Sequence, residues 1–359
     1  MGNIFDSARV NSLFKDERFL YPEFVPERLP FRNKEISELV FCLKPATYGK
    51  APVNVFVSGS PGTGKTVTIK FVLNELGEFS DRAKCFYVNC FEFSTKQAIL
   101  SRLTNGLGYA VAQRGISFEE LYSRFVSVLR SSKVIPIIVF DEAEQLLSDD
   151  VKKSLLYDLA RLPEQQKIPI GLVFISNDSF FLSRLDERTR SSLQCSSIPF
   201  SRYSVVELKE ILNERARFAF FDFVLDEDVI PLCAANAAKL GGDARVAISV
   251  LLKAGRLAER ENAKKVGVKH VRAALMQEKP VKTEIIFNLT EQEKEILNLL
   301  DRLGFKEVDS GLIYSSLGGK FSERTLRNAI SSLGKKNLVS FERKVKGRGV
   351  TRVIKKNRF

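Results

Sequence analysis

The sequence predicts an α/β fold for the first part of the chain, a helical bundle for the middle, and a small domain of helices and a hairpin at the end. Three observations predict this order. Strand-like apolar runs alternate with amphipathic stretches from about residue 53, the strands stop after residue 200, and Pro280 precedes a last, basic segment. A chain of 359 residues has room for two or three cores. We therefore expect domains at 1–200, 201–279 and 280–359.

Four apolar runs predict the sheet of the first domain. They are VNVFVSG, CFYVNC, PIIVFDEA and IGLVFISN, and each is followed by a polar, amphipathic stretch. Continuous apolar strands that alternate with helices are typical of a parallel sheet covered on both faces. Residues 204–278 have apolar positions at helical spacing instead, with Ser204 as the first cap. This middle region is expected to be a helical bundle.

The last 80 residues show a different pattern. Thr290 and Glu293 form a capping-box signature before the apolar periodicity of residues 296–303. A second helix is expected at about 309–317 and a third from Ser322, and two β-rich runs then flank residues 347–349. Three helices followed by a hairpin are the layout of a winged helix.

The formal charge of +13 is unevenly distributed. Residues 280–359 hold 17 Lys or Arg and 9 Asp or Glu, a net charge of +8. Such an excess favours a polyanionic partner, although a solvated surface that promotes solubility is the alternative.

Composition also argues against several classes of protein. Five cysteines without a C-x-x-C pair, and a single histidine, favour neither a zinc site nor a disulfide framework. No apolar run has the length of a membrane span and no export signal is apparent. We expect a cytoplasmic, nucleoid-associated protein with no membrane partner.

A glycine-rich loop follows the first apolar strand and precedes a helix that begins near Thr66. Its sequence, GSPGTGKT, matches G-x-x-x-x-G-K-[ST] without a gap. Backbone N–H groups of such a loop surround phosphate oxygens, Lys65 adds a positive charge, and Thr66 offers a hydroxyl to Mg²⁺. The loop therefore predicts a nucleoside triphosphate site, the alternative being a glycine-rich turn that matches by chance. The residues expected to bind the nucleotide are Gly59, Pro61, Gly62, Thr63, Gly64, Lys65 and Thr66.

Two acids end the third apolar run. Asp141 is expected to hold Mg²⁺ together with Thr66, and Glu142 to orient or deprotonate the attacking water. A solvated strand end would explain the two acids but not their combination with the loop upstream. Glu144 is expected to be a surface residue.

Two further polar residues are candidates for contact with the γ-phosphate. Asn177 ends another apolar strand, where its amide could reach the phosphate or the water, unless it only forms a turn. Arg245 begins a helix of the middle region in the segment GGDAR, and the alternative for it is an ordinary surface arginine.

Together these residues resemble the Walker A (59–66), Walker B (Asp141 and Glu142), sensor 1 (Asn177) and sensor 2 (Arg245) motifs of an AAA+ ATPase. The order of base, helical lid and winged helix resembles the archaeal replication initiators related to the origin-recognition complex and its cell-division-control partner. Residues 21–36 resemble the stretch of that family that packs near adenine, 185–193 its segment after sensor 1, and 241–255 its lid signature.

The resemblance implies an inserted helical element at 94–125, in which Lys96, Arg102 or Arg114 would touch DNA, although a solvated helix face is an equal alternative. The chain departs from the AAA+ pattern after sensor 1. Ser191-Ser192-Leu193 stands where many relatives have Ser-Arg-Cys, so the usual arginine finger is missing. Arg188 or Arg190 could replace it, and hydrolysis driven by assembly is in doubt.

The third helix of the winged helix would enter the major groove of DNA. If Leu326, Ile330 and Leu333 pack inward, the polar residues between them face solvent, where arginine suits guanine edges and asparagine suits adenine. Lysines at the helix end would contact phosphate, and an arginine between two glycines at the wing tip suits a minor groove. The residues expected to contact DNA are Arg324, Thr325, Arg327, Lys335, Lys336, Lys346, Arg348 and Arg352, with Asn328, Arg343 and Lys344 beside them.

The resemblance implies an initiator that binds ATP or ADP with Mg²⁺, hydrolyses ATP slowly, binds double-stranded origin DNA, and contacts the replicative helicase and initiator paralogues. Two other functions remain open. One is a clamp or helicase loader that holds DNA without sequence preference. The other is a signalling or transcription-regulating NTPase whose winged helix has another partner.

Overall fold

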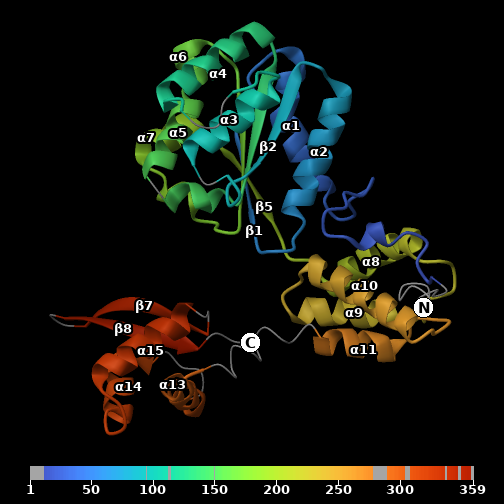
Figure 1. The fold of residues 1–359 in the computed structure, drawn as a ribbon, viewed down its shortest axis with the longest axis vertical. Coiled ribbons are helices and arrows are strands. Elements are labelled where there is room, and N and C mark those ends of the chain that lie inside the picture. The colour runs from blue at the N-terminus through green and yellow to red at the C-terminus, as the bar shows by residue number, and fades with distance from the viewer. Residues whose placement is uncertain are drawn as a thin grey trace, which may run out of the picture. The chain divides into compact units, whose positions relative to one another are not determined.

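The computed structural model describes residues 12–93, 95–111, 115–148, 150–277, 289–303, 308–335, 338–346 and 349–356. The chain divides into two compact units, Met1–Ala274 and Leu275–Phe359. The first contains a five-stranded sheet with its helices and a helical lid, and the described part of the second contains three helices and a small sheet (Figure 1).

The large sheet is parallel, with the order β2-β3-β4-β1-β5. The central strands β3 and β4 are buried along their whole length, which explains why their sequences are continuous apolar runs. The strands are β1 (Val55–Gly59), β2 (Ala83–Asn89), β3 (Ile135–Asp141), β4 (Gly171–Ser176) and β5 (Ser196–Phe200).

Helices cover both faces of this sheet (Figure 1). On one face, α1 (Asn33–Leu43) and α2 (Lys65–Phe79) pack on Val57 and Val139. On the other face lie α3 (Lys96–Gly106), α4 (Phe118–Ser132), α5 (Asp150–Ala160), α6 (Leu162–Gln166) and α7 (Glu187–Leu193). The first unit also contains the short 3₁₀ helices η2 (Glu17–Leu20), η3 (Lys44–Tyr48), η4 (Ala143–Ser148) and η5 (Phe181–Arg184).

The lid consists of α8 (Val205–Ala219), α9 (Val229–Lys239), α10 (Ala244–Arg260) and α11 (Val268–Gln277). Ser204 and Glu207 form a complete capping box at the start of α8, so the chain changes from strand to helix within four residues of β5. In α10 the buried positions include Ala247, Val250, Leu251 and Ala254, which is the spacing of one helix face.

The second unit contains α13 (Glu291–Arg302), α14 (Ser310–Leu317) and α15 (Glu323–Lys335), followed by a hairpin of β7 (Val339–Lys346) and β8 (Gly349–Lys356). The two-residue strand β6 (Val308–Asp309) pairs with β8, which gives an antiparallel sheet of order β6-β8-β7. This is a winged-helix arrangement, and the predicted fold class is confirmed for both units.

Candidate functional site

The carboxyl ends of three neighbouring strands form the floor of the site. Because β4 lies between β1 and β3, the loop after β1, Asn177 after β4 and Asp141 at the end of β3 meet at one edge of the sheet. The register makes these ends level, since Ser58 pairs with Ser176 and Asp141 pairs with Ile175. Ligands of open parallel sheets bind at this edge.

The loop between β1 and α2 has the conformation that its glycines allow. Gly62 and Gly64 have φ angles of 73° and 88°, a region that residues with a Cβ rarely adopt. A side chain at Gly62 would collide with the Asp243 carboxylate, and one at Gly64 would come within 2.5 Å of the Tyr203 hydroxyl. The loop is therefore closely packed against the lid and the segment that leads to it.

The Lys65 amine is bound by oxygen atoms of the loop and of Asn177. Its Nζ donates to the carbonyl oxygens of Gly59 (2.7 Å) and Ser60 (2.9 Å) and to Oδ1 of Asn177 (2.9 Å). Burial is the main cause that lowers the pKa of the Lys65 amine below its usual value, and the nearby Arg245 lowers it further. A cation held in this way gains from an anionic ligand in the adjacent cavity.

The Asp141 carboxylate is held by three donors. Thr66 Oγ1 donates to Oδ2 (2.8 Å), the Glu142 N–H donates to Oδ1 (2.9 Å), and the Tyr87 hydroxyl also donates to Oδ2. One hydroxyl and one carboxylate oxygen so close together fit Mg²⁺, which usually takes one or two protein oxygens and completes its shell with phosphate and water. Among the described residues no group of three or more His, Cys, Asp or Glu could hold a metal ion by itself.

Glu142 sits where the chain turns sharply away from β3. Its φ angle of 56° lies in the left-handed region, which costs free energy for a residue with a side chain and is often found at functional sites. Burial, followed by the neighbouring Glu144 and Asp141, raises the pKa of the Glu142 carboxyl.

Glu144 differs from the sequence-based expectation of a surface residue. Its side chain is half-buried, and Oε2 accepts a hydrogen bond of 2.5 Å from Ser176 Oγ, at the end of β4. Ser176 Oγ also accepts the Asp178 N–H (3.0 Å), so Glu144 helps to fix the turn that carries Asn177.

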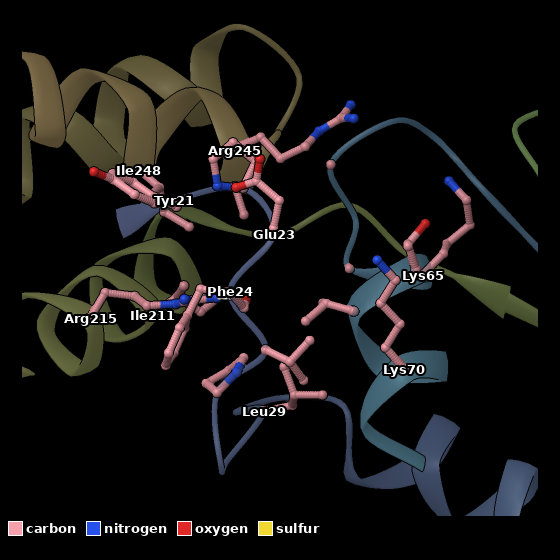
Figure 2. A pocket seen from close by; sticks show the side chains of 18 of the residues that line it. Tyr21, Glu23, Phe24, Leu29, Lys65, Lys70, Ile211, Arg215, Arg245 and Ile248 are labelled. Atoms are coloured by element: carbon pink, nitrogen blue, oxygen red, sulfur yellow. Dashed lines mark hydrogen bonds between the residues drawn. The ribbon is translucent and has the colours of Figure 1, made fainter. Parts of the chain in front are cut away.

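A cavity of about 380 Å³ lies in front of these groups. Figure 2 shows Lys65 and Lys70 reaching toward it from α2, while Arg245 extends from the lid on another side. Its wall includes Pro61, Gly62, Gly64, Lys65, Thr66, Asp141, Glu142, Asn177 and Arg245, which the sequence had selected. Gly59 and Thr63 are not part of this wall, because Gly59 faces Phe200 and Thr63 is fully buried.

Much of the remaining wall comes from the N-terminal strap, which we define as residues 13–32, and the rest comes from the lid helices α8 and α10 and from neighbouring residues of the base. Residues 21–26 and 28–30 line the cavity, and they belong to the stretch 21–36 that resembles the family's segment near adenine. The strap first follows the lid: Phe14 stacks on Phe220 with ring centroids 4.6 Å apart, and it occupies the space that a side chain at Gly255 would need.

Arg215 of α8 joins the strap to the lid beside the cavity (Figure 2). Its guanidinium donates to the carbonyl oxygens of Phe19 (2.9 Å) and Phe24 (3.2 Å) and lies over the Phe24 ring. The residue is only 9% exposed, and burial lowers the pKa of Arg215 to about 10. A buried cation bound to two backbone carbonyls fixes the path of the strap.

Arg32 fixes the other end of the strap to the base. Its guanidinium donates to the carbonyl oxygen of Thr63 twice (2.8 and 3.1 Å) and to that of Ser201 (2.8 Å), and it stacks on Tyr203 at 4.0 Å. One buried arginine thus contacts the glycine loop and the segment between β5 and the lid.

Arg245 is paired within the lid. Its guanidinium donates to Asp243 (3.1 Å), the N-cap residue of α10, and the backbone N–H of Ala244 donates to the Gly62 carbonyl (3.1 Å). The Arg245 side chain is 61% exposed, so this ion pair is weak and can yield to a phosphate.

The candidates elsewhere in the first unit do not line this cavity. Arg188 and Arg190 are exposed on α7. Lys96 lies over the Phe118 ring at 3.8 Å and Arg102 near Phe93 at 5.9 Å, while Arg114 lies outside the described residues.

In the second unit, α15 has the expected two faces. Leu326, Ile330 and Leu333 are at most 2% exposed, which confirms their inward packing. The residues between them are exposed: Arg324, Thr325, Arg327 and Asn328. Lys336 and Arg348 lie outside the described residues, and the side chains of the other candidates, Lys335, Arg343, Lys344, Lys346 and Arg352, are not described.

Sequence reasoning missed several residues that shape the site. Arg215 carried a detectable signal, because it occupies the buried face of α8 that Leu208 and Leu212 define, where a charge is unexpected. Arg32 and Tyr87 gave none, since each reaches the site through contacts that are distant in sequence.

Comparison with known proteins shows which class of protein has this fold and site. Residues 51–181 match the family model of the AAA domain, and residues 209–276 match that of the Cdc6 AAA+ ATPase-type lid domain. The fold and the site therefore define an AAA+ ATPase domain with its lid.

The relatives narrow the class to a family. The chain is 37% identical over 332 residues to the ORC1-type DNA replication protein of Thermococcus kodakarensis, covering 88% of this chain and 79% of that protein. It is 39% identical over 300 residues to ORC1-type DNA replication protein 1 of Sulfurisphaera tokodaii, covering 82% and 74%. The Aeropyrum pernix ORC1 protein, solved in complex with DNA, superposes with a TM-score of 0.72 at 32% identity over 96% of this chain and 93% of that one. The chain belongs to the ORC1/Cdc6-type family of archaeal DNA replication initiators.

No helix within the described ranges is long and apolar enough to cross a membrane.

Proposed function

We propose that this protein binds ATP or ADP with Mg²⁺ in the cavity between base, lid and strap, hydrolyses ATP slowly, and binds double-stranded origin DNA through its winged helix. The proposed partners of the protein are the replicative helicase, which it helps to recruit, and initiator paralogues. The observation that carries it is that the glycine loop, Asp141, Glu142, Asn177 and Arg245 converge on one cavity.

Each residue has a role that its position supports. N–H groups of the glycine loop and Lys65 bind phosphate oxygens, and Thr66 with Asp141 holds Mg²⁺, which supplies charge neutralisation during phosphoryl transfer. Glu142 orients the attacking water and accepts its proton. Asn177 exchanges its bond to Lys65 for one to the γ-phosphate or the water.

Nucleotide binding would also set the position of the lid. Arg245 is held by Asp243 at the edge of the glycine loop, so a γ-phosphate competes with Asp243 for the same guanidinium. The Ser191-Ser192-Leu193 segment lacks the usual arginine finger, which supports slow hydrolysis that acts as a timer.

Replacement of Arg215 with glutamine is expected to weaken nucleotide binding about tenfold. The change leaves buried carbonyl oxygens on the strap without a full set of donors, which costs about 1–3 kcal/mol, and 1.4 kcal/mol corresponds to tenfold in affinity. A fluorescent adenine nucleotide, titrated against variant and parent, measures the effect.

Arg217→Gln is the matched control, because Arg217 is exposed on the same helix. It should bind nucleotide as the parent does. If Arg215→Gln and the parent bind nucleotide with equal affinity, the path of the strap does not contribute to nucleotide binding.

Replacement of Arg327 with alanine is expected to weaken binding to the specific DNA site about 5- to 150-fold, because a bidentate contact to a base contributes about 1–3 kcal/mol. Arg327 is free to make such a contact, since its pair with Glu323 (3.3 Å) is exposed on both sides. Fluorescence anisotropy at several salt concentrations measures the affinity and its salt slope.

Arg302→Ala, at the end of α13 and also exposed, is the control for loss of one positive charge. If the two variants lose the same modest affinity on every DNA sequence, α15 does not read bases. If Arg327→Ala instead weakens DNA binding about equally on all sequences and reduces the salt slope by about one, Arg327 contacts a phosphate and not a base.

The experiment that tests the function is enrichment of genomic DNA. The purified protein is mixed with sheared DNA from its own genome at physiological salt, with ATP or ADP, and the retained DNA is sequenced. Enrichment of one or a few intergenic loci supports an origin-binding initiator and identifies its site. Uniform recovery that disappears as salt rises would favour the loader alternative, and enrichment at many promoters the regulatory one.

A further inference from the structure

We propose that Tyr87 is a positioning residue for the Mg²⁺ site, which it serves by orienting the Asp141 carboxylate through a hydrogen bond that does not depend on the glycine loop. This inference rests on the proposed nucleotide function. Tyr87 lies in β2, outside every motif that the sequence indicated.

Strand register brings the two side chains together. Tyr87 pairs with Val139 and Asn89 pairs with Asp141, so Tyr87 and Asp141 are diagonal neighbours on adjacent strands. Residues two apart in a strand share a face of the sheet, and Tyr87 packs beside Val139 on the face that α2 covers. The Tyr87 ring thus lies on the same side of the sheet as Asp141, and its hydroxyl reaches Oδ2.

The direction of the hydrogen bond follows from chemistry. An ionised carboxylate can only accept, so the phenol must donate. Burial is the largest cause that raises the pKa of the Tyr87 phenol far above its usual value, and the bond to Asp141 raises it further. The Tyr87 hydroxyl is thus the donor and the Asp141 carboxylate the acceptor.

Two other contacts fix the Tyr87 ring. It packs into the cluster formed by the sheet and α2, and the Lys70 ammonium lies 4.8 Å from its centroid. Lys70 also reaches into the nucleotide cavity (Figure 2). The position of the Tyr87 hydroxyl is therefore fixed by a ring that packs between β2 of the large sheet and α2.

The other donor to Oδ2 belongs to the glycine loop. Thr66 donates to Asp141 (2.8 Å), and a lone pair of the same hydroxyl remains to bind the ion, so this hydrogen bond depends on the position of the loop. The hydrogen bond from Tyr87 involves no atom of the glycine loop. It can therefore hold the Asp141 carboxylate in one orientation before and after Mg²⁺ binds. Groups that orient metal ligands in this way typically change metal affinity 10- to 100-fold when removed.

The test is Tyr87→Phe in the full chain, which removes only the hydroxyl. A fluorescent ADP analogue is titrated in EDTA and then over a range of Mg²⁺ concentrations. We expect unchanged ADP affinity in EDTA and about a tenfold rise in the Mg²⁺ concentration that gives half of the metal-dependent increase in affinity.

Tyr122→Phe is the matched control. Tyr122 is also half-buried, but it packs on the opposite face of the sheet, and its hydroxyl donates to the backbone carbonyl of Asp158 (3.3 Å). It should change neither measurement. The parent must bind the ADP analogue, and if it does not, the proposed function fails before this inference is tested.

Two results would overturn the inference. One is an unchanged or lower Mg²⁺ requirement in Tyr87→Phe, which would mean that the bond does not orient Asp141 for the ion. The other is an equal loss of ADP affinity in EDTA and in Mg²⁺, which would make Tyr87 a support of the loop rather than of the metal site.

Discussion

The Lys65→Ala variant is expected to lose nucleotide binding, with an affinity reduced at least about 30-fold. Truncation of one partner of a desolvated charge pair costs about 2–5 kcal/mol, and 1.4 kcal/mol corresponds to tenfold. Lys65 is buried beside the cavity, and its amine is aimed at three oxygen atoms of the loop and of Asn177. Calorimetry with ATP and with ADP, both in the presence of Mg²⁺, measures the loss.

The same variant leaves the carbonyls of Gly59 and Ser60 without their present donor, so its folding must be checked by thermal unfolding without nucleotide. Lys84→Ala, an exposed lysine of β2, controls for the lost charge. Nucleotide affinity like that of the parent in a folded Lys65→Ala protein would refute the assignment of the site.

The second large effect is expected for Glu142→Gln, which should bind ATP as the parent does but hydrolyse it at least about 100-fold more slowly. A general base contributes about 100- to 10,000-fold to a rate, and glutamine keeps the size of the side chain without its basicity. Single-turnover hydrolysis, measured beside equilibrium binding, separates the two properties.

The raised pKa of Glu142 adds a pH dependence. The carboxylate must be ionised to act as a base, so the rate of the parent should fall on acidification at a pH above the usual range of a glutamate, and the variant should lack this decline. A folded-state pKa above the unfolded value also means that the ionised group opposes folding at neutral pH. Glu142→Gln is therefore expected to unfold at the same temperature as the parent or a higher one.

Glu120→Gln, an exposed glutamate of α4, is the control for the lost charge. Normal turnover in Glu142→Gln would exclude it as the base, and loss of ATP binding would show that its carboxylate serves the structure of the site instead.

The sequence predicted the fold well because its signals are local. A strand buried in a parallel sheet is apolar, and β3 and β4 are apolar up to their last residues, so the strands and the polar residues at their ends could be recognised without coordinates. Asp141 and Asn177 belong to such ends, Lys65 follows the glycine loop after β1, and the order of the strands brings the three together.

The parts of the site that escaped prediction depend on distant contacts. Arg32 meets Ser201 across 169 residues, and Tyr87 meets Asp141 across 54. Neither pair has a fixed spacing or a periodicity, so only the packing of the sheet, the strap and the lid defines it. Glu144 was expected at the surface because its place in η4, which packs beside β4, is likewise a tertiary feature.

The N-terminal strap gives α8 a second attachment, and this has a mechanical consequence. Both connections from the base start at one point, where Arg32 binds the Ser201 carbonyl. One enters α8 at Ser204 and the other reaches it through Arg215, roughly 16 Å further along at 1.5 Å per residue. Prolines at 22, 26 and 30 stiffen the longer connection. These three points form a triangular brace, which resists tilting of α8 within the plane of the triangle.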